Sequence, residues 1–203
     1  LLDDDHATVP PRNVAALRAA SERGAAVTIA SGRAWSLLQG VNAQLGVTRY
    51  AVLSNGAAVL DVKTGEWLYR RPLDPDARRT ILTLLLDWGL PFEVYCEGEN
   101  YIQREVWGPL AVTTSFGENM ELTAPGVNKG TAVQALCARL GLGPEQVMAF
   151  GDAGNDLELL RWSGWSFAMG NASAEAKAAA RHLTGTNREG GVGMAVEQYL
   201  LTP

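Results

Sequence analysis

Short apolar runs alternate with segments of helical periodicity along most of this chain. The runs typical of buried strands are 26–30, 50–53, 147–150 and 166–169. Apolar residues recur at helical spacing, or a helical pattern opens, over 11–23, 31–38, 128–140, from 157 onward, and over about 174–180. Because strands that alternate with helices form parallel sheets with right-handed crossovers, the pattern predicts a doubly wound, Rossmann-like α/β core.

The alternation stops between residues 57 and 122. Short strands and turns come first, then a helix over about 74–88 that begins at Asp74-Pro75, and then a pair of strands at 92–95 and 101–103. This mixture predicts a small α+β domain built separately from the parallel sheet. We therefore assign residues 1–59 and 124–203 to the core and residues 60–123 to an inserted cap domain.

Composition narrows the possible partners. The chain has 203 residues and a net charge of −5, without the cluster of Lys and Arg that non-specific nucleic-acid binding requires. Its apolar runs are too short to span a bilayer, and no stretch matches a secretory signal. Cys96 and Cys137 are far apart and indicate reduced thiols. We expect a cytoplasmic protein with no nucleic-acid or membrane partner.

The segment 151–156, Gly-Asp-Ala-Gly-Asn-Asp, lies between the apolar run at 147–150 and the helical pattern that begins at Leu157. Two acids and an amide therefore follow a predicted parallel strand, at the edge where open α/β sheets bind ligands. Carboxylate and amide oxygens suit Mg²⁺. Asp152 and Asp156 are candidate metal ligands, with Asn155 either a further ligand or a donor to phosphate. A polar turn that only caps the helix would use the same residue types.

Three more turns follow predicted strands or open helices. They are 31–33 (Ser-Gly-Arg), 54–56 (Ser-Asn-Gly) and 128–131 (Asn-Lys-Gly-Thr). In a doubly wound sheet all four turns can converge on one edge. The Ser31 hydroxyl and the N–H groups of Ser31 and Gly32 can donate to an anion at a helix start. Lys129 opens a helix, where a cation opposes the helix dipole, so an anionic partner is indicated.

Each of these residues also has a simpler interpretation. Ser31 can be a helix N-cap, and Lys129 can be a solvated surface lysine. Taken together, however, a divalent cation, an ammonium group and aimed donors are what a doubly charged phosphate ester needs in a dry site. The combination therefore favours phosphate chemistry.

The motifs resemble, in their order and spacing, those of the haloacid dehalogenase (HAD) superfamily, and most closely its Cof-type sugar-phosphatase branch. The segments that carry the resemblance are 30–33 (Ala-Ser-Gly-Arg), 54–57 (Ser-Asn-Gly-Ala), 125–130 (Pro-Gly-Val-Asn-Lys-Gly), 150–156 (Phe-Gly-Asp-Ala-Gly-Asn-Asp), 168–172 (Ala-Met-Gly-Asn-Ala) and 186–192 (Thr-Asn-Arg-Glu-Gly-Gly-Val). They span almost the whole chain, and the branch inserts its cap before the lysine motif, as predicted here.

The resemblance implies a Mg²⁺-dependent phosphohydrolase that acts on a small phosphorylated metabolite, such as a sugar phosphate, through an aspartyl-phosphate. It implies catalytic roles for Lys129, Ser31 and Asp156. Ser31, Gly32, Lys129 and Asn155 would bind the phosphate, and Asp152 and Asn155 would hold Mg²⁺.

One motif of the family has no match. Its Asp-x-Asp-Gly-Thr sequence, which carries the nucleophile and the acid/base, precedes a Leu-Leu pair, and here Leu1-Leu2 are the first residues. We therefore expect the nucleophile upstream of Leu1. Asp3 and Asp5 have the right spacing, but no apolar strand precedes them and no Gly-Thr follows. The alternative function is a non-catalytic phosphate-binding or interaction module that retains the fold.

Other phosphate and cation motifs are excluded. No Gly-x-Gly-x-x-Gly follows the first strand, as a dinucleotide-binding domain would need, and the Lys129 turn lacks the earlier Gly of a Walker loop. Gly154 lies where an EF-hand places its second acidic ligand.

Overall fold

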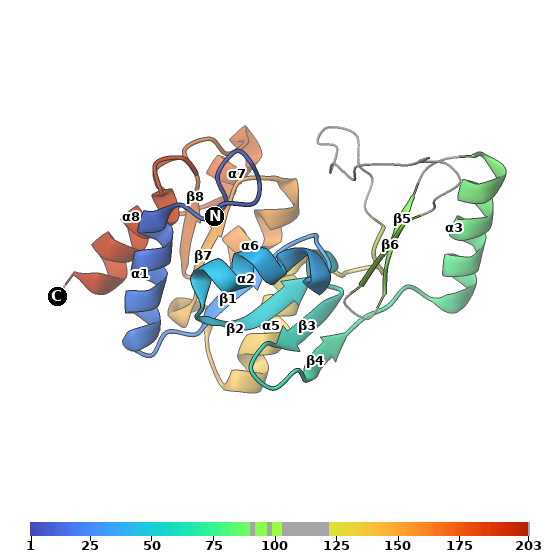
Figure 1. Ribbon diagram of the computed structural model, residues 1–203, viewed down its shortest axis with the longest axis horizontal. Coiled ribbons are helices and arrows are strands. Elements are labelled where there is room, and N and C mark those ends of the chain that lie inside the picture. Colours follow the sequence, from blue (N-terminus) through green and yellow to red (C-terminus); the bar gives the residue numbers. More distant parts are fainter. Residues whose placement is uncertain (90–91, 97–98, 103–121, 203) are drawn as a thin grey trace.

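The computed structural model covers residues 1–203 and describes residues 1–89, 92–96, 99–102 and 122–202 (Figure 1). Its helices are α1 (Pro11–Glu22), α2 (Gln39–Leu45), α3 (Pro75–Asp87), α5 (Lys129–Leu140), α6 (Leu157–Trp162), α7 (Ala174–Ala179) and α8 (Gly191–Val196). Its strands are β1 (Val27–Ala30), β2 (Thr48–Leu53), β3 (Ala58–Asp61), β4 (Trp67–Arg70), β5 (Glu93–Cys96), β6 (Glu99–Ile102), β7 (Met148–Gly151), β8 (Trp165–Ala168) and β9 (His182–Leu183). Single turns of 3₁₀ helix are η1 (Trp35–Leu38), η2 (Ser54–Gly56), η3 (Pro144–Gln146) and η4 (Gly154–Asp156), and η5 (Glu197–Leu201) is a π-helical turn.

Local sequence sets where the longer helices begin. Pro11 occupies the first turn of α1, where its missing N–H costs nothing. The Asp74 carboxylate caps α3 by accepting from the N–H groups of Asp76 and Ala77. Asn128 caps α5 in a reciprocal capping box with Thr131. These starts confirm the predicted helices at residues 11, 74 and 128 to within one residue.

The strands of the core form two sheets. The first has the order β1-β2-β3-β4, in which β1 and β2 are parallel and the pairs β2–β3 and β3–β4 are antiparallel. The second has the order β7-β8-β9 and is parallel throughout. β1 and β7 are therefore the terminal strands of their sheets, and parallel strands with helical crossovers make up the predicted α/β core.

The predicted insert needs one correction. We assigned the chain from about residue 57 to a unit separate from the sheet, with the cap boundary at 60. In the structure, β3 pairs with β2 and β4 pairs with β3, so this hairpin extends the core sheet. The reason is a long-range pairing that local periodicity does not report, since two short strands and a Gly65 turn look the same in either sheet.

The core lies on both faces of β2, whose side chains alternate. Tyr50 and Val52 pack with α5 residues and with Ala149 of β7. Ala51 and Leu53 pack on the other face with α2. A third cluster joins α1 and α8 to the second sheet; its buried members are Ala16, Ala20, Leu160, Ala168, Met169, Ala172, Ala176, Val192 and Val196. Helices therefore cover both faces, as a doubly wound sheet requires.

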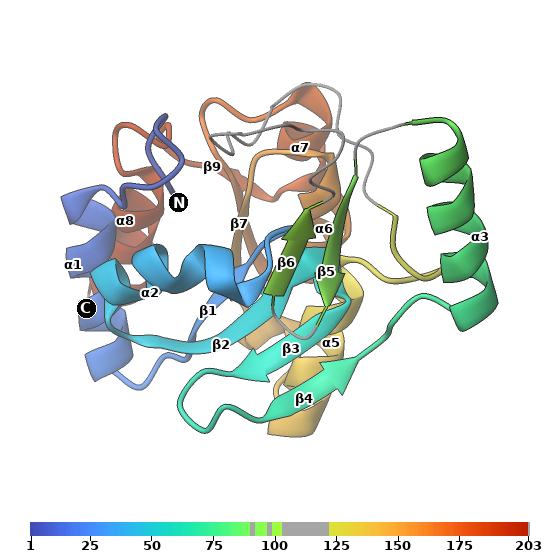
Figure 2. The ribbon, with the colours of Figure 1, turned by 45° about the vertical axis from the view of Figure 1, so that its right-hand side comes forward.

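Of the remaining elements, α3 lies at one end of the molecule, and the antiparallel hairpin β5–β6 lies between α3 and the core, where β6 contacts η1 (Figures 1 and 2). They confirm the predicted helix and the predicted pair of strands. No residue of α3 is buried. Residues 103–121 of the predicted cap lie outside the described ranges. Within those ranges, no helix has both the length and the apolar character needed to cross a membrane.

Candidate active site

Direct contacts link all four predicted turns. The Lys129 ammonium donates to Asp156 over 2.7 Å, which joins the 128–131 turn to the 151–156 turn. The Asn155 amide donates to the Asn55 side-chain oxygen over 3.0 Å. The Asn55 N–H in turn donates to the Ser31 carbonyl over 3.1 Å. The predicted convergence on one edge of the sheets is therefore present in the structure.

Asp156 is the centre of this network. Its side chain is buried, and Oδ1 accepts from Lys129. Its Oδ2 accepts from the N–H groups of Asp152, over 2.9 Å, and Ala153, over 3.2 Å. Both oxygens are thus committed to donors of the protein. Asp156 therefore holds the turn and the lysine in place, and it is poorly suited to the role of metal ligand that the residue types alone allowed.

Lys129 is a buried residue with 6% exposure, which rules out the interpretation as a solvated surface lysine. It is the first residue of α5, so its charge opposes the helix dipole as predicted. Asp156 is the anionic partner, and both side chains of the pair are more than nine-tenths buried. Such a pair is stable only when its geometry and additional hydrogen bonds offset the loss of water.

Glycines let these elements approach closely. A Cβ on Gly151 would lie 2.5 Å from the Cβ of Asp156, and a Cβ on Gly130 would lie 2.7 Å from the backbone of Glu158. The first glycine gives Asp156 room to fold back over the end of β7. The second lets the start of α5 pack against α6, which carries Lys129 to Asp156.

Asp152 is the carboxylate with free access to a ligand. Part of its surface reaches water, yet surrounding protein displaces much of its hydration. Its pKa is raised first by that burial and then by the like charge of Asp156, while Lys129 acts in the opposite direction. A carboxylate in this position is electrostatically favourable for a cation. One carboxylate with an amide oxygen, water and phosphate is a donor set that Mg²⁺ accepts, so the residues present fit this metal.

Ser31 lies beside this network, but the structure corrects part of the prediction. Its N–H donates to the Val52 carbonyl, as part of the β1–β2 pairing, and is not available to an anion. No helix starts directly after it either: η1 begins at Trp35 and α2 at Gln39. The Ser31 hydroxyl accepts from the Arg33 N–H over 3.1 Å and remains able to donate its own proton.

The backbone nitrogen of Leu1 also belongs to this region and lies within electrostatic reach of Asp152 and Asp156. The Leu1 carbonyl accepts from Asn13, which is fully buried in α1 and also accepts from the N–H of Gly193.

The acids that follow Leu2 have other partners. Asp5 accepts from the N–H groups of Ala7 and Thr8 and from the Thr8 hydroxyl, which hold its pKa at about 2. Asp4 pairs with Arg188 at the surface. The Asp5 carboxylate thus stabilises its own loop, in line with our choice not to assign Asp3 and Asp5 as nucleophile and acid/base.

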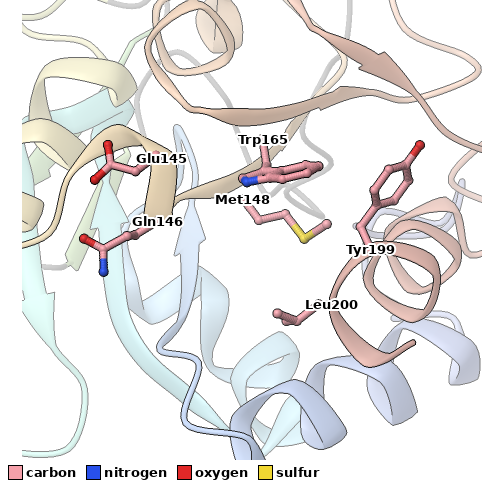
Figure 3. A pocket seen from close by; sticks show the side chains of 6 residues that line it. All are labelled: Glu145, Gln146, Met148, Trp165, Tyr199 and Leu200. Carbon is pink, nitrogen blue, oxygen red and sulfur yellow. The ribbon is translucent and has the colours of Figure 1, made fainter. Parts of the chain in front are cut away.

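A cavity of about 190 Å³ lies elsewhere, and its mostly apolar lining consists of Met148, Trp165, Tyr199 and Leu200 together with Glu145 and Gln146 (Figure 3). Met148 and Trp165 are the first residues of β7 and β8, whereas Asp152 follows the last residue of β7. The cavity is therefore at the amino ends of these strands, opposite the edge that carries the charged network. It provides no cation for a phosphate.

Local sequence patterns did not assign a role to two residues of this region, Asn55 and Asn13. Asn55 was part of a predicted turn, and an Asn-Gly pair after a strand was the available signal. Asn13 gave a weaker signal, a single amide within the periodic pattern of α1. Their partners lie 100 and 180 residues away, which no local pattern reveals.

Comparison with known proteins agrees with this arrangement. The family model described as haloacid dehalogenase-like hydrolase matches residues 1–109 and 99–196. A 5-amino-6-(5-phospho-D-ribitylamino)uracil phosphatase of Bacillus subtilis is 27% identical over an alignment of 231 positions, which covers 99% of this chain and 92% of that protein. A phosphoglycolate phosphatase of Methanothermobacter thermautotrophicus is 28% identical over an alignment of 205 positions, which covers 92% of this chain and 89% of that protein.

Solved structures confirm the predicted α/β fold class. A haloacid dehalogenase-like hydrolase from B. subtilis superposes with a TM-score of 0.84 at 23% identity, covering 98% of this chain and 96% of that one. The relatives named above are phosphatases, which supports the prediction of a phosphatase. With the family model matched along nearly its whole length, the chain belongs to the haloacid dehalogenase-like hydrolases, as the resemblance to the Cof-type branch predicted.

Proposed function

We propose that this protein is a Mg²⁺-dependent phosphatase of small phosphorylated metabolites that works through an aspartyl-phosphate. The observation that carries the proposal is the buried Lys129–Asp156 pair at the carboxyl end of β7, with the accessible carboxylate of Asp152 beside it. A fixed ammonium group next to a site for a divalent cation is what a phosphoryl group with developing negative charge requires.

The roles follow from the contacts. Lys129 is held by Asp156 and offers its remaining N–H donors to phosphate oxygens. The Ser31 hydroxyl is a second donor to those oxygens, with Gly32 next to it. Asp152 and Asn155 would hold Mg²⁺, which, when bound, neutralises charge on the phosphate and on the attacking group. Asp156 acts through Lys129 and the turn, so it is a positioning residue rather than a ligand.

We further propose that the nucleophile is an aspartate that precedes Leu1. The backbone nitrogen of Leu1 lies within electrostatic reach of Asp152, Asp156 and Lys129, so residues joined to it would enter this site. β1 and β7 are terminal strands, and Ala30 of β1 and Ala149 of β7 belong to one apolar cluster. A strand that leads into Leu1 would fit between them.

The chemistry of such a site runs in two steps. A carboxylate oxygen of the upstream aspartate attacks phosphorus, and the bond to the ester oxygen breaks. The second aspartate of the same motif gives the leaving alcohol its proton. Water then attacks the aspartyl-phosphate and transfers its proton to that second aspartate, which releases phosphate and restores both carboxyl groups.

In this proposal the cap determines which phosphate esters are bound. α3 and the β5–β6 hairpin would cover the carboxyl edge, exclude water and contact the group that leaves with the phosphate. The relatives' names describe a phosphoribityl compound and phosphoglycolate, which are both small phosphate esters. We propose a substrate of this class, acted on in the cytoplasm by a monomer or homodimer.

The test is phosphate release by the product of the native gene, with a panel of sugar phosphates and other small esters, in the presence of Mg²⁺ and after chelation. Asp152→Asn should abolish Mg²⁺-dependent release while the protein remains folded. Glu22→Gln, at the exposed end of α1, is the control that removes a surface carboxylate and should leave release unchanged. Full activity of the Asp152 variant would remove this residue from the metal site.

The assignment of the nucleophile has its own test. A chain of the 203 residues shown here should bind phosphate without detectable turnover. Robust release by that chain would refute an upstream nucleophile. Binding without turnover by the native gene product as well would favour the non-catalytic module instead.

A further inference from the structure

Asn55 makes a contact that the roles above do not use. Its side-chain oxygen accepts from Nδ2 of Asn155 over 3.0 Å. Asn55 belongs to η2, at the end of β2, whereas Asn155 belongs to η4, after β7. The hydrogen bond therefore joins the two core sheets across the edge that carries Lys129 and Asp152.

The backbone around Asn55 is unusual. Ser54, Asn55 and Gly56 have φ values of +48°, +51° and +100°, so three successive residues are left-handed. Such a run is costly for residues with a side chain, and asparagine tolerates it better than most. Gly56 touches the Asn128 carbonyl so closely that a Cβ would lie 2.1 Å from that oxygen. The turn is therefore pressed against the start of α5, and this conformation directs Asn55 to Asn155.

We propose that Asn55 is a positioning residue that fixes the orientation of the Asn155 amide. Because Nδ2 of Asn155 donates to Asn55, its Oδ1 is left as the atom that can accept from, or bind to, a ligand. The orientation thus frees the oxygen for one of the two roles that the sequence allowed for Asn155, that of an oxygen ligand for a cation, and leaves only one Nδ2 hydrogen for a phosphate. This inference rests on the proposed phosphatase function.

The same bond also explains why Asn155 can serve although it is exposed. An exposed amide on a turn samples several rotamers, and ordering it on ligand binding costs conformational entropy. Asn55 removes that cost beforehand, since its own backbone is held by the N–H bond to Ser31 and by the contact of Gly56 with α5. Loss of Asn55 should therefore weaken the use of Mg²⁺ more than the binding of the ester.

Asn55→Gly is the informative variant, because glycine adopts a positive φ freely and the change removes the side chain without straining the turn. In the native gene product we expect kcat/KM to fall by about tenfold and the Mg²⁺ midpoint to rise, with the melting temperature nearly unchanged. In an Asn155→Ala background the same change should cost less than about twofold, because the partner through which Asn55 acts is gone. Equal losses in both backgrounds would overturn the proposal.

A measurement without catalysis separates this inference from the proposed function. In the 203-residue chain, the side-chain amide resonance of Asn155, assigned from Asn155→Ala, should shift in Asn55→Gly. The amide of Asn187, which donates to Leu2 and Asp4, is the internal control and should stay in place. An unmoved Asn155 resonance would refute the hydrogen bond, whereas absent turnover in the unaltered native protein would refute the phosphatase assignment.

Discussion

Lys129→Met removes the ammonium group from a pair in which both side chains are more than nine-tenths buried. Methionine keeps most of the length and apolar character of the lysine stem, so the change isolates the charge. Removal of one partner from a buried pair destabilises a protein by roughly 3–5 kcal/mol, because the other charge stays buried without its counter-ion. Asp156 keeps two backbone N–H donors, so we expect the lower end, about 3 kcal/mol.

Urea denaturation of the 203-residue chain, followed by circular dichroism, measures this loss. With a slope of about 2 kcal/mol per molar urea, the midpoint should fall by about 1.5 M. Lys177→Met is the matched control, since Lys177 is an exposed lysine in α7, and its midpoint should move by less than about 0.3 M. Arg139→Met, which removes an exposed ion pair with Glu66, should cost no more than about 1 kcal/mol.

A midpoint shift for Lys129→Met no larger than that for Lys177→Met would refute a stabilising role of the buried pair. The double variant Lys129→Met/Asp156→Asn adds a second criterion. Because it leaves neither charge unpaired, it should be more stable than the sum of the two single losses predicts. Additive losses would mean that the two side chains do not interact.

Three further predictions concern stability and reactivity. Gly56→Ala should lower the free energy of unfolding in urea by at least about 2 kcal/mol, because its Cβ would meet the Asn128 carbonyl. Gly65 also has a positive φ but open space around it, so Gly65→Ala should cost only about 1 kcal/mol, and equal losses for the two variants would contradict the close contact at Gly56. Burial alone would raise the pKa of Asp61, but the N–H groups of Thr64 and Lys63 and the Arg49 guanidinium outweigh it and lower that pKa. The stability that the ionised Asp61 contributes is therefore complete above the unfolded pKa of about 3.9 and is lost as pH falls through the lower folded pKa. The urea midpoint of Asp61→Asn should depend less on pH below 4 than that of the unaltered chain, and an equally steep dependence would count against this assignment. Burial also raises the pKa of the Cys137 thiol. In a Cys96→Ser variant, where Cys137 is the cysteine left to react, a thiol reagent at pH 8 should label the folded protein at least about tenfold more slowly than the urea-unfolded protein. Equal labelling rates would contradict the burial of Cys137.

Local signals predicted much of the fold. The caps Asp74 and Asn128 and the proline at 11 set helix starts, and short apolar runs marked β1, β2, β7 and β8, because these features depend on neighbours within a few residues. The pairing of β3 and β4 with the core sheet was missed because it depends on distant partners. α8 and β9 were missed because Gly191 and Gly193 disguise a six-residue helix and two residues are too few for a strand pattern.

In the candidate site, too, local sequence identified the residues, whereas their contacts depended on distant partners. The residue types and their place after strands pointed to Lys129, Asp152 and Asp156, and the opposed dipole at Lys129 correctly indicated an anionic partner. What the sequence could not distinguish was the distribution of tasks among the acids. Only the hydrogen bonds show that Asp156 is fully committed to protein donors and that Asp152 is the accessible carboxylate.

The contact between Gly56 and Asn128 has an architectural consequence. The β3–β4 hairpin and then the cap follow Gly56, and Asn128 directly precedes α5 of the core. The two ends of the segment between Gly56 and Asn128 are therefore in contact. This segment is a closed loop, and the entropy cost of closing it grows only slowly with its length. A junction of this kind would let insertions and deletions change the length of this segment while the residues of the candidate active site keep their positions. New substrate specificities would then arise without a change in the catalytic residues.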